Sequence, residues 1–281
     1  MFKKFLILML IIMLVGCMPA APVAGDGRIK IVAAIFPQYD FARVIAGDKA
    51  DISLLLPPGV ESHTYQPTSA DVVAIENADM FLHTGESWAK NFQTKNKVDI
   101  SQNVLISEDD PHIWTDPNNA KIMVDNIVRE LCAADPESAE YYIKNAEEYK
   151  LQLDELDVRL QSISKGKIVF AGENPMHYFL ERYGFDHDAV IDSCGDEGEP
   201  AAQAVVRIIS EIKEQDIKTV FYTEFLAPSI TNTIIDETGA VPVLLHACHN
   251  VSKAEAELGM TYLELMSKNA ETLEAAFNES N

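Results

Sequence analysis

Short apolar runs and amphipathic helical stretches alternate along most of the chain. The pattern begins at residue 29, and Gly and Pro mark several of the turns between the runs. Strands that alternate with helices in this way are typical of a mainly parallel sheet covered on both faces. The elements expected in the first part are strands at 29–35, 52–56 and 79–84 and helices at 38–46 and 69–78.

The middle of the chain predicts helices only. One helix is expected at 118–134, and after Asp135-Pro136 the segment 137–164 runs without Gly or Pro. A helix of that length, about 28 residues, spans about 42 Å. We interpret it as a strut packed along two lobes rather than a coiled-coil dimer, since so short a heptad run between α/β units is more often an intramolecular brace. Its predicted apolar stripe is Tyr142, Ala146, Tyr149, Leu153, Leu156, Leu160 and Ile163.

After Gly166 the alternation of strands and helices returns. We therefore predict an α/β fold of two similar lobes joined by one long rigid helix, with a ligand site in the cleft between them. The expected domains are an N-terminal lobe at 28–135, a linker helix at 136–165 and a C-terminal lobe at 166–281. The later elements are strands at 167–171, 189–192, 219–223 and 241–245 and helices at 175–183, 205–214, 229–238 and 262–277.

The N-terminal residues predict a secretory signal. Two lysines precede eleven unbroken apolar residues, Phe5 to Val15, a run shorter than the roughly 20 residues that span a bilayer. Leu14-Val15-Gly16-Cys17 resembles the bacterial lipobox, in which the signal is cut before a Cys that carries a diacylglyceryl group. We expect a signal peptide at 1–16 and a lipid-attached tether at 17–27, which would anchor the protein outside the cytoplasm to the bacterial cell membrane. The alternative is an ordinary signal peptide with an incidental Cys.

The net charge of the chain disfavours some classes of binding partner. The 281 residues include 22 Lys+Arg and 44 Asp+Glu, a formal net charge of −22, and 47% are hydrophobic. Loss of residues 1–16 would remove two lysines, giving 20 − 44 = −24. Such an acid excess disfavours nucleic acid and anionic lipid surfaces as partners.

Three cysteines follow the lipobox. Cys132 lies in an apolar helical stretch and is expected to be a small buried residue. Cys194 and Cys248 fall in predicted loops, where a disulfide could persist outside the reducing cytosol.

Candidate ligands stand at strand ends and helix starts. His63 lies in the turn after the strand at 52–56, Glu173 follows the strand at 167–171, and His246 follows the strand at 241–245. His112 comes just before a helix for which Asp116 is a natural N-cap and Pro117 a natural first residue. The chain has no His-Glu-x-x-His and no Cys-x-x-Cys, so neither a helix-borne hydrolase site nor a zinc ribbon is supported.

Several phrases resemble the zinc- and manganese-binding solute-binding lipoproteins of bacterial ABC importers, the high-affinity metal-uptake group (cluster A-I). The resemblance implies two α/β lobes joined by one long helix, with a single metal between them. Asp110-Pro111-His112-Ile113-Trp114-Thr115-Asp116-Pro117 is the most specific phrase. The others are Phe36-Pro37-Gln38-Tyr39-Asp40-Phe41, Leu56-Pro57-Pro58-Gly59 with His63 and Pro67, Tyr178-Phe179 with Arg182-Tyr183-Gly184, and Thr238-Gly239.

The family's metal ligands map onto this chain one by one. His63 and His112 match the first two, and Glu173 matches the third, where zinc-type members usually have His and manganese-type members often have Glu. The fourth position is usually Asp and is here His246, in the altered phrase His246-Ala247-Cys248-His249-Asn250, so His249 is the alternative fourth ligand. The chain also lacks the His-rich loop of many zinc-type members.

Three imidazoles and one carboxylate favour Zn²⁺, because Mn²⁺ prefers more oxygens and a higher coordination number. Mn²⁺ is the alternative because of Glu173. The resemblance thus implies a monomer that captures Zn²⁺ and delivers it to a membrane permease of an ABC importer, and not an enzyme. Alternatives of another class are a zinc-dependent hydrolase, with Glu173 as general base, and a surface adhesin.

Overall fold

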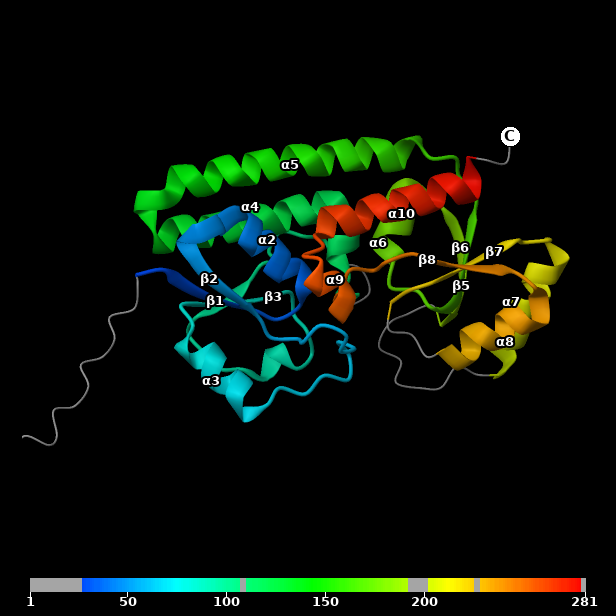
Figure 1. Ribbon diagram of the computed structural model, residues 1–281, viewed down its shortest axis with the longest axis horizontal. Coiled ribbons are helices and arrows are strands. Elements are labelled where there is room, and N and C mark those ends of the chain that lie inside the picture. Colours follow the sequence, from blue (N-terminus) through cyan, green and yellow to red (C-terminus); the bar gives the residue numbers. More distant parts are fainter. Residues whose placement is uncertain (1–26, 107–109, 192–201, 225–227, 279–281) are drawn as a thin grey trace, which may run out of the picture.

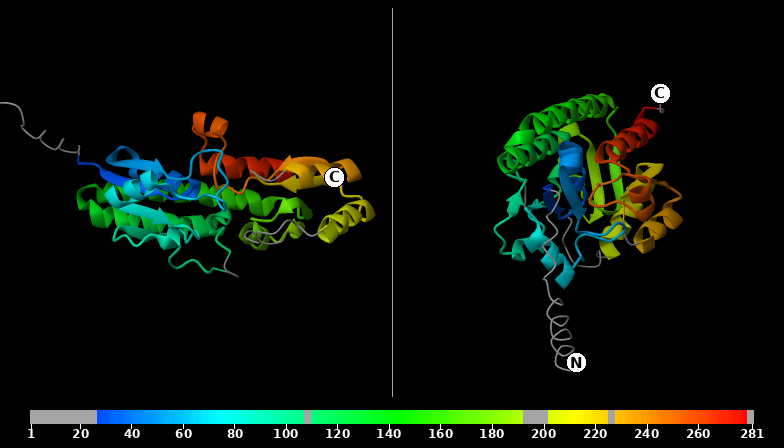
Figure 2. Two further views of the ribbon diagram at one scale, coloured as in Figure 1. Left: turned by 90° about the horizontal axis from the view of Figure 1, so that it is seen from below. Right: turned by 60° about the vertical axis from the view of Figure 1, so that its left-hand side comes forward.

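The computed structural model describes residues 27–106, 110–191, 202–224 and 228–278. Within them, two four-stranded parallel sheets form two lobes that lie side by side along the long axis of the molecule (Figures 1 and 2). The expected fold class is therefore confirmed. The expected signal peptide, Cys17 and Cys194 lie outside the described residues, and the domain boundaries stay a prediction.

The sheet of the N-terminal lobe has the strand order β2-β1-β3-β4. Its central strand β1 pairs in parallel with β2 and β3, so that Ile31 lies opposite Ile52 on one side and Met80 on the other. The strand β4 was not predicted, because three residues with a charged residue at each end give no apolar run. The elements of this lobe are β1 (Ile29–Ala33), α2 (Phe36–Ala46), β2 (Ala50–Leu54), α3 (Ser69–Asn77), β3 (Met80–His83) and β4 (Lys97–Asp99).

The sheet of the C-terminal lobe has the order β6-β5-β7-β8, so both sheets repeat one topology. Its strand β6 begins three residues before the predicted start, because polar Asp186 and His187 concealed it. The short helix α9 was also not predicted. The elements are β5 (Lys167–Glu173), α6 (His177–Tyr183), β6 (Asp186–Ile191), α7 (Ala202–Glu214), β7 (Thr219–Tyr222), α8 (Pro228–Thr238), β8 (Val241–Leu244), α9 (Lys253–Glu257) and α10 (Tyr262–Phe277).

Two helices, α4 (Pro117–Ala134) and α5 (Ala139–Ser162), connect the lobes along one side of the molecule (Figure 1). Asp116 caps α4 by accepting a hydrogen bond from the backbone N–H of Asn118, and Pro117 is its first residue, as predicted. Residues 136–138 form a 3-10 turn, so α5 begins two residues later than expected. All seven residues of the predicted stripe are buried, and α5 packs on α2, α4 and α10 within the same chain.

The main hydrophobic core runs through both lobes without a break. It includes residues of the first sheet, the stripe of α5, and residues of β5, α6 and α10. A second, smaller core lies between the far face of the second sheet and helices α7 and α8. Because the lobes share one core through α5 and α10, we expect them to shift only slightly relative to each other.

A partly buried ion pair joins three helices at the junction of the lobes. Asp157 on α5 accepts hydrogen bonds from Arg182 Nε at 2.8 Å and Nη2 at 2.7 Å, and from the Tyr183 hydroxyl at 2.7 Å. Arg182 on α6 also lies 3.2 Å from the carboxylate of Asp116, which caps α4. Burial opposes ionisation of Asp157, but the bonds from Arg182 and Tyr183 outweigh it and lower the pKa of this carboxyl.

We expect Asp157→Ala to lower the free energy of unfolding by about 3 kcal/mol at pH 7, because Arg182 loses its buried partner. The matched control is Asp154→Ala on the same helix, whose carboxylate pairs with Lys121 at the surface and which should cost less than about 1 kcal/mol. A carboxyl whose pKa is lower in the folded state stabilises the protein at pH values above its unfolded-state pKa. This stabilisation is lost as the pH falls through the folded-state pKa. The deficit of Asp157→Ala should therefore shrink as urea unfolding is repeated from about pH 5 toward about pH 2. This interpretation would be contradicted if both variants lost the same free energy of unfolding, or if the loss for Asp157→Ala did not depend on pH.

Candidate metal centre

Three histidines from distant parts of the sequence meet at one point. One ring nitrogen from each of His63, His112 and His249 lies within 4.8 Å of the others. The ring centroids are 5.7 Å apart for His63 and His112, 5.2 Å for His63 and His249, and 4.3 Å for His112 and His249. Such a group of imidazole nitrogens is a set of ligands for a transition-metal ion.

His112 is buried and held by a carboxylate. Its Nδ1 contacts Asp110 Oδ1, and the same oxygen accepts a hydrogen bond from the His112 backbone N–H at 2.9 Å. Burial opposes ionisation of Asp110, but the contact with His112 outweighs it and lowers the pKa of the carboxyl. Nε2 of His112 is buried and has no hydrogen-bond partner among the described residues. A carboxylate behind one ring nitrogen fixes the ring and leaves the other nitrogen for a metal.

His249 has a similar environment. The carboxylate of Glu224 accepts a hydrogen bond from the His249 backbone N–H at 3.1 Å and lies 4.0 Å from its Nδ1. Within the part of the chain that the structure describes, the buried Nε2 of His249 has no hydrogen-bond partner. Burial lowers the pKa of His249 well below its ordinary value, and the neighbouring His112 and His63 lower it further. The ring is therefore neutral near pH 7, which is the form that binds a metal.

His63 is the solvent-exposed member of the group. Its loop is held by Glu61, whose carboxylate accepts the backbone N–H groups of His63 and Thr64, each at 2.8 Å. Desolvation within the group lowers the pKa of His63, and His112 lowers it further, whereas Glu61 and Glu173 act in the opposite direction.

Glu173 comes from the other lobe, as the last residue of β5. It does not belong to the group of atoms that lie within 4.8 Å of one another. Its carboxylate is nevertheless close enough for its charge to act on His63. The structure therefore brings together three of the predicted histidines, counting the alternative His249, with Glu173 beside them.

The structure does not bring His246 into this group. Its Nδ1 accepts a hydrogen bond from the Cys248 backbone N–H at 2.9 Å, and its Nε2 lies 3.7 Å from Glu255. Cys248 has φ of 60°, so the chain turns sharply and presents His249, not His246, to the other histidines. A left-handed residue after a strand leaves no signal in the apolar pattern, so the sequence favoured His246, whereas the structure places His249 in this group.

Two carboxylates of the site were not predicted as site residues. Asp110 lies within the Asp-Pro-His phrase, two residues before His112. Glu224 follows β7 through Thr223, so the same strand-end reasoning that selected Glu173 applied to it as well.

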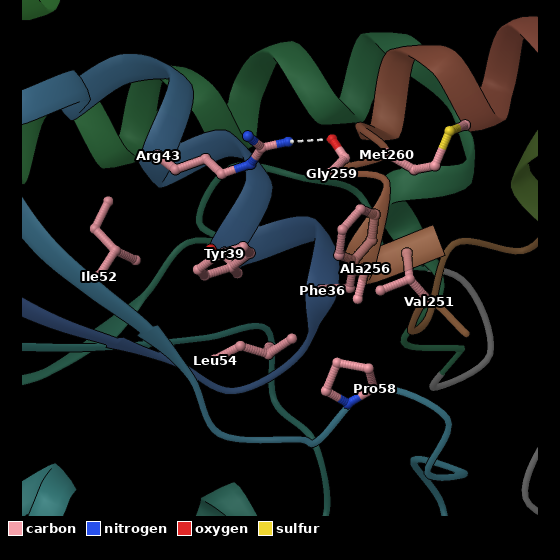
Figure 3. A pocket seen from close by; sticks show the side chains of 10 residues that line it. All are labelled: Phe36, Tyr39, Arg43, Ile52, Leu54, Pro58, Val251, Ala256, Gly259 and Met260. Carbon is pink, nitrogen blue, oxygen red and sulfur yellow. Dashed lines mark hydrogen bonds between the residues drawn. The ribbon is translucent and has the colours of Figure 1, made fainter. Parts of the chain in front are cut away.

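A cavity of about 240 Å³ lies next to the residues that follow His249 (Figure 3). It is enclosed by α2 and β2 of the N-terminal lobe and by the segment from Val251 to Met260. Most of its lining is apolar, and Arg43 reaches the carbonyl oxygen of Gly259 across one side. Since no imidazole or carboxylate lines it, this cavity is not a metal site.

Cys132 and Cys248, the two cysteines that the structure describes, take no part in the group. Cys248 is fully buried and forms no disulfide with another cysteine among the described residues. The proposed disulfide with Cys194 stays a prediction, because Cys194 lies outside the described residues. Cys132 is half-buried rather than fully buried, with Sγ 3.8 Å from the carbonyl oxygen of Ala139.

Fold and site together define a class: a two-lobed α/β protein with a group of three histidines that could hold a metal ion. Among the described residues, no helix is long and apolar enough to cross a membrane. Known proteins refine this class. Residues 31–276 match the family model described as "ZnuA: Zinc-uptake complex component A periplasmic". The chain belongs to this family, whose members are uptake components and not enzymes, so we do not retain the hydrolase alternative.

The relatives differ in the metal that their names give. The high-affinity zinc uptake system protein ZnuA of Bacillus subtilis is 27% identical over 89% of this chain and 87% of its own. The Zn(II)-bound ZnuA-like domain of Streptococcus pneumoniae AdcA is 25% identical, with a TM-score of 0.77 over 90% of this chain and all of that one. A Mn-bound periplasmic metal-binding protein of Candidatus Liberibacter asiaticus is also 25% identical, with a TM-score of 0.75 over 89% of this chain and all of that one. The laminin-binding protein Lmb of Streptococcus agalactiae, titled a bifunctional adhesin and metal transporter, is 27% identical, with a TM-score of 0.78 over 89% of this chain and 99% of its own.

The different surroundings of His246 and His63 predict different effects on the metal-free protein. His246→Ala should lower the free energy of unfolding by about 2 kcal/mol, because the buried N–H of Cys248 loses its acceptor. His63→Ala, in an exposed position, should change it by less than about 0.5 kcal/mol. Urea unfolding after metal removal measures both. If His63→Ala destabilised the protein more than His246→Ala, the structural role assigned to His246 as acceptor for the Cys248 N–H would be wrong.

Proposed function

We propose that the protein captures Zn²⁺ outside the cytoplasm and delivers it to the membrane permease of an ABC importer. The observation that supports this best is the group of His63, His112 and His249, with two ring nitrogens buried and unpartnered. An unpaired buried polar atom is costly unless a ligand satisfies it.

We propose His63, His112, His249 and Glu173 as the metal ligands. The three imidazoles come from strand-end or helix-start loops packed on one lobe, and the carboxylate comes from the other. Neutral imidazoles and an ionised carboxylate replace the hydration shell of the ion, and four such ligands match the tetrahedral sites that Zn²⁺ prefers. Without an open position for a reacting water, the site suits capture rather than hydrolysis.

Zinc is favoured over manganese on chemical grounds. Three nitrogen donors suit Zn²⁺, and the affinity of a given site for Zn²⁺ generally exceeds that for Mn²⁺. Relatives whose names give zinc support this choice, and the Mn-bound relative keeps Mn²⁺ as the alternative.

Titration of the metal-stripped protein with Zn²⁺ and Mn²⁺ tests the proposal. We expect binding of one Zn²⁺, tighter than Mn²⁺, and His249→Ala should weaken zinc binding by more than about 100-fold, above the range for outer-shell residues. His246→Ala is the matched control, because it removes an imidazole three residues away, and it should weaken zinc binding by no more than about 10-fold.

Two results would contradict the proposal. Absence of tight binding of either metal would end the transport hypothesis. A larger loss for His246→Ala than for His249→Ala would restore His246 as the fourth ligand.

Membrane attachment through Cys17 and a monomeric state remain part of the proposal. Radiolabelled palmitate should be incorporated into the wild-type protein expressed in a bacterium, and Cys17→Ser should abolish the label, because the thiol is the acceptor. Cys132→Ser is the control and should leave the label unchanged. Equal labelling of the Cys17→Ser protein would show that the lipobox interpretation is wrong.

Adhesion is a second candidate function, favoured by the likeness to a protein titled both adhesin and metal transporter. Solid-phase binding of the mature protein to laminin would separate the two functions, since transport alone predicts no saturable binding.

A further inference from the structure

The segment from Leu245 to Val251, which directly follows β8, bridges the two lobes. Several of its N–H groups bond to Tyr222, Glu224 and Asn269 of the C-terminal lobe, whereas its carbonyl oxygens from Ala247 onward accept hydrogen bonds from the N-terminal lobe. Three hydrogen bonds with backbone groups of this segment make the connection. They are Trp114 Nε1 to the Ala247 oxygen at 2.8 Å, the Phe36 N–H to the His249 oxygen at 3.3 Å, and the Gly59 N–H to the Val251 oxygen at 2.8 Å.

The residue after His249 makes the densest of these contacts. Asn250 is fully buried, and its Nδ2 donates to the carbonyl oxygens of Pro57 at 2.8 Å and Val60 at 2.9 Å. Its Oδ1 accepts the backbone N–H of Val251 at 2.9 Å. Residues 57–60 begin the loop that carries His63, so one side chain links the loops of two ligand histidines.

The conformation of this segment needs such support. Cys248 holds a left-handed φ of 60°, a conformation that is strained for a residue other than glycine. From the C-terminal lobe, Glu224 secures the turn through the backbone N–H groups of Ala247 and His249. The N-terminal lobe holds the segment through Trp114, which donates to the Ala247 oxygen, and through the 57–60 loop, whose carbonyl oxygens accept from the Asn250 side chain.

We propose that Asn250 is a positioning residue for metal capture, which holds the His249 loop on the His63 loop and so assembles the three imidazoles before the ion arrives. The inference rests on the proposed function, since it concerns the same site. Its physical basis is that Asn supplies two donors and one acceptor in one short rigid amide. Ala at this position would release the loop, so that His249 would have to be ordered when zinc binds and the zinc affinity would fall.

The chain offers a matched control in Asn126 on α4. This residue is also buried, and its Nδ2 likewise donates to two carbonyl oxygens of one loop, those of Ile100 at 2.9 Å and Gln102 at 2.8 Å. These two residues follow β4 directly, and Gln102 lies ten residues before His112, the nearest proposed ligand in that part of the chain. Asn250→Ala and Asn126→Ala should therefore destabilise the metal-free protein to a similar degree, whereas only Asn250→Ala should weaken zinc binding, by about 10–100-fold.

A double-mutant cycle with His249→Ala separates positioning from general damage. If Asn250 acts through His249, adding Asn250→Ala to His249→Ala should weaken zinc binding by less than about 2-fold further. If the fold as a whole is impaired, the two losses should multiply. Asn250→Ser, which keeps one donor, gives an intermediate loss of affinity and serves as the second variant if Asn250→Ala does not fold.

These experiments distinguish a failure of the positioning role of Asn250 from a failure of the proposed function. Suppose that the wild-type protein binds zinc tightly. If Asn250→Ala then changes the affinity by less than about 3-fold, or by no more than Asn126→Ala does, the inference is overturned while the proposed function stands. Multiplying losses in the double mutant would also overturn it. Failure of the wild-type protein to bind zinc would overturn the proposed function itself.

Discussion

The site depends on one constraint: the chain after β8 must cross to the other lobe. Leu245 still pairs with Tyr222 of its own sheet, and the chain is then joined to the N-terminal lobe by backbone bonds to Phe36, Gly59 and Trp114 and by the buried amide of Asn250. This crossing places His249 among histidines that precede it by more than 130 residues. Three imidazoles thus belong to one body of the protein, while Glu173 belongs to the other.

The long helices make this arrangement rigid. The stripe of α5 is buried along both lobes, α10 returns along it, and Arg182 connects Asp157 with the cap of α4. A shared core of this kind resists wide hinge opening, so entry and release of an ion are expected to involve small shifts between Glu173 and the three histidines. Carboxylates behind His112 and His249 orient the rings, and the neutral state of His249 avoids competition between proton and metal.

The sequence predicted the features that depend on local pattern. The apolar stripe from Tyr142 to Ile163, the cap at Asp116 and the alternation of strands and helices all follow from spacing, and each is confirmed. Placement of His63, His112 and Glu173 near one another followed from the strand-end rule and from the resemblance. The fourth position could not be predicted, because the direction of a side chain after β8 depends on the left-handed turn at Cys248 and on tertiary contacts with Glu224 and Asn250.

X-ray absorption at the zinc edge of the protein loaded with one equivalent of Zn²⁺ tests the central claim most directly, because it counts the ligands around the ion. The account predicts a four-coordinate site with three imidazoles and one carboxylate, with Zn–N distances of about 2.0–2.1 Å. A sulfur ligand at about 2.3 Å, or a six-coordinate site dominated by oxygen, would contradict it.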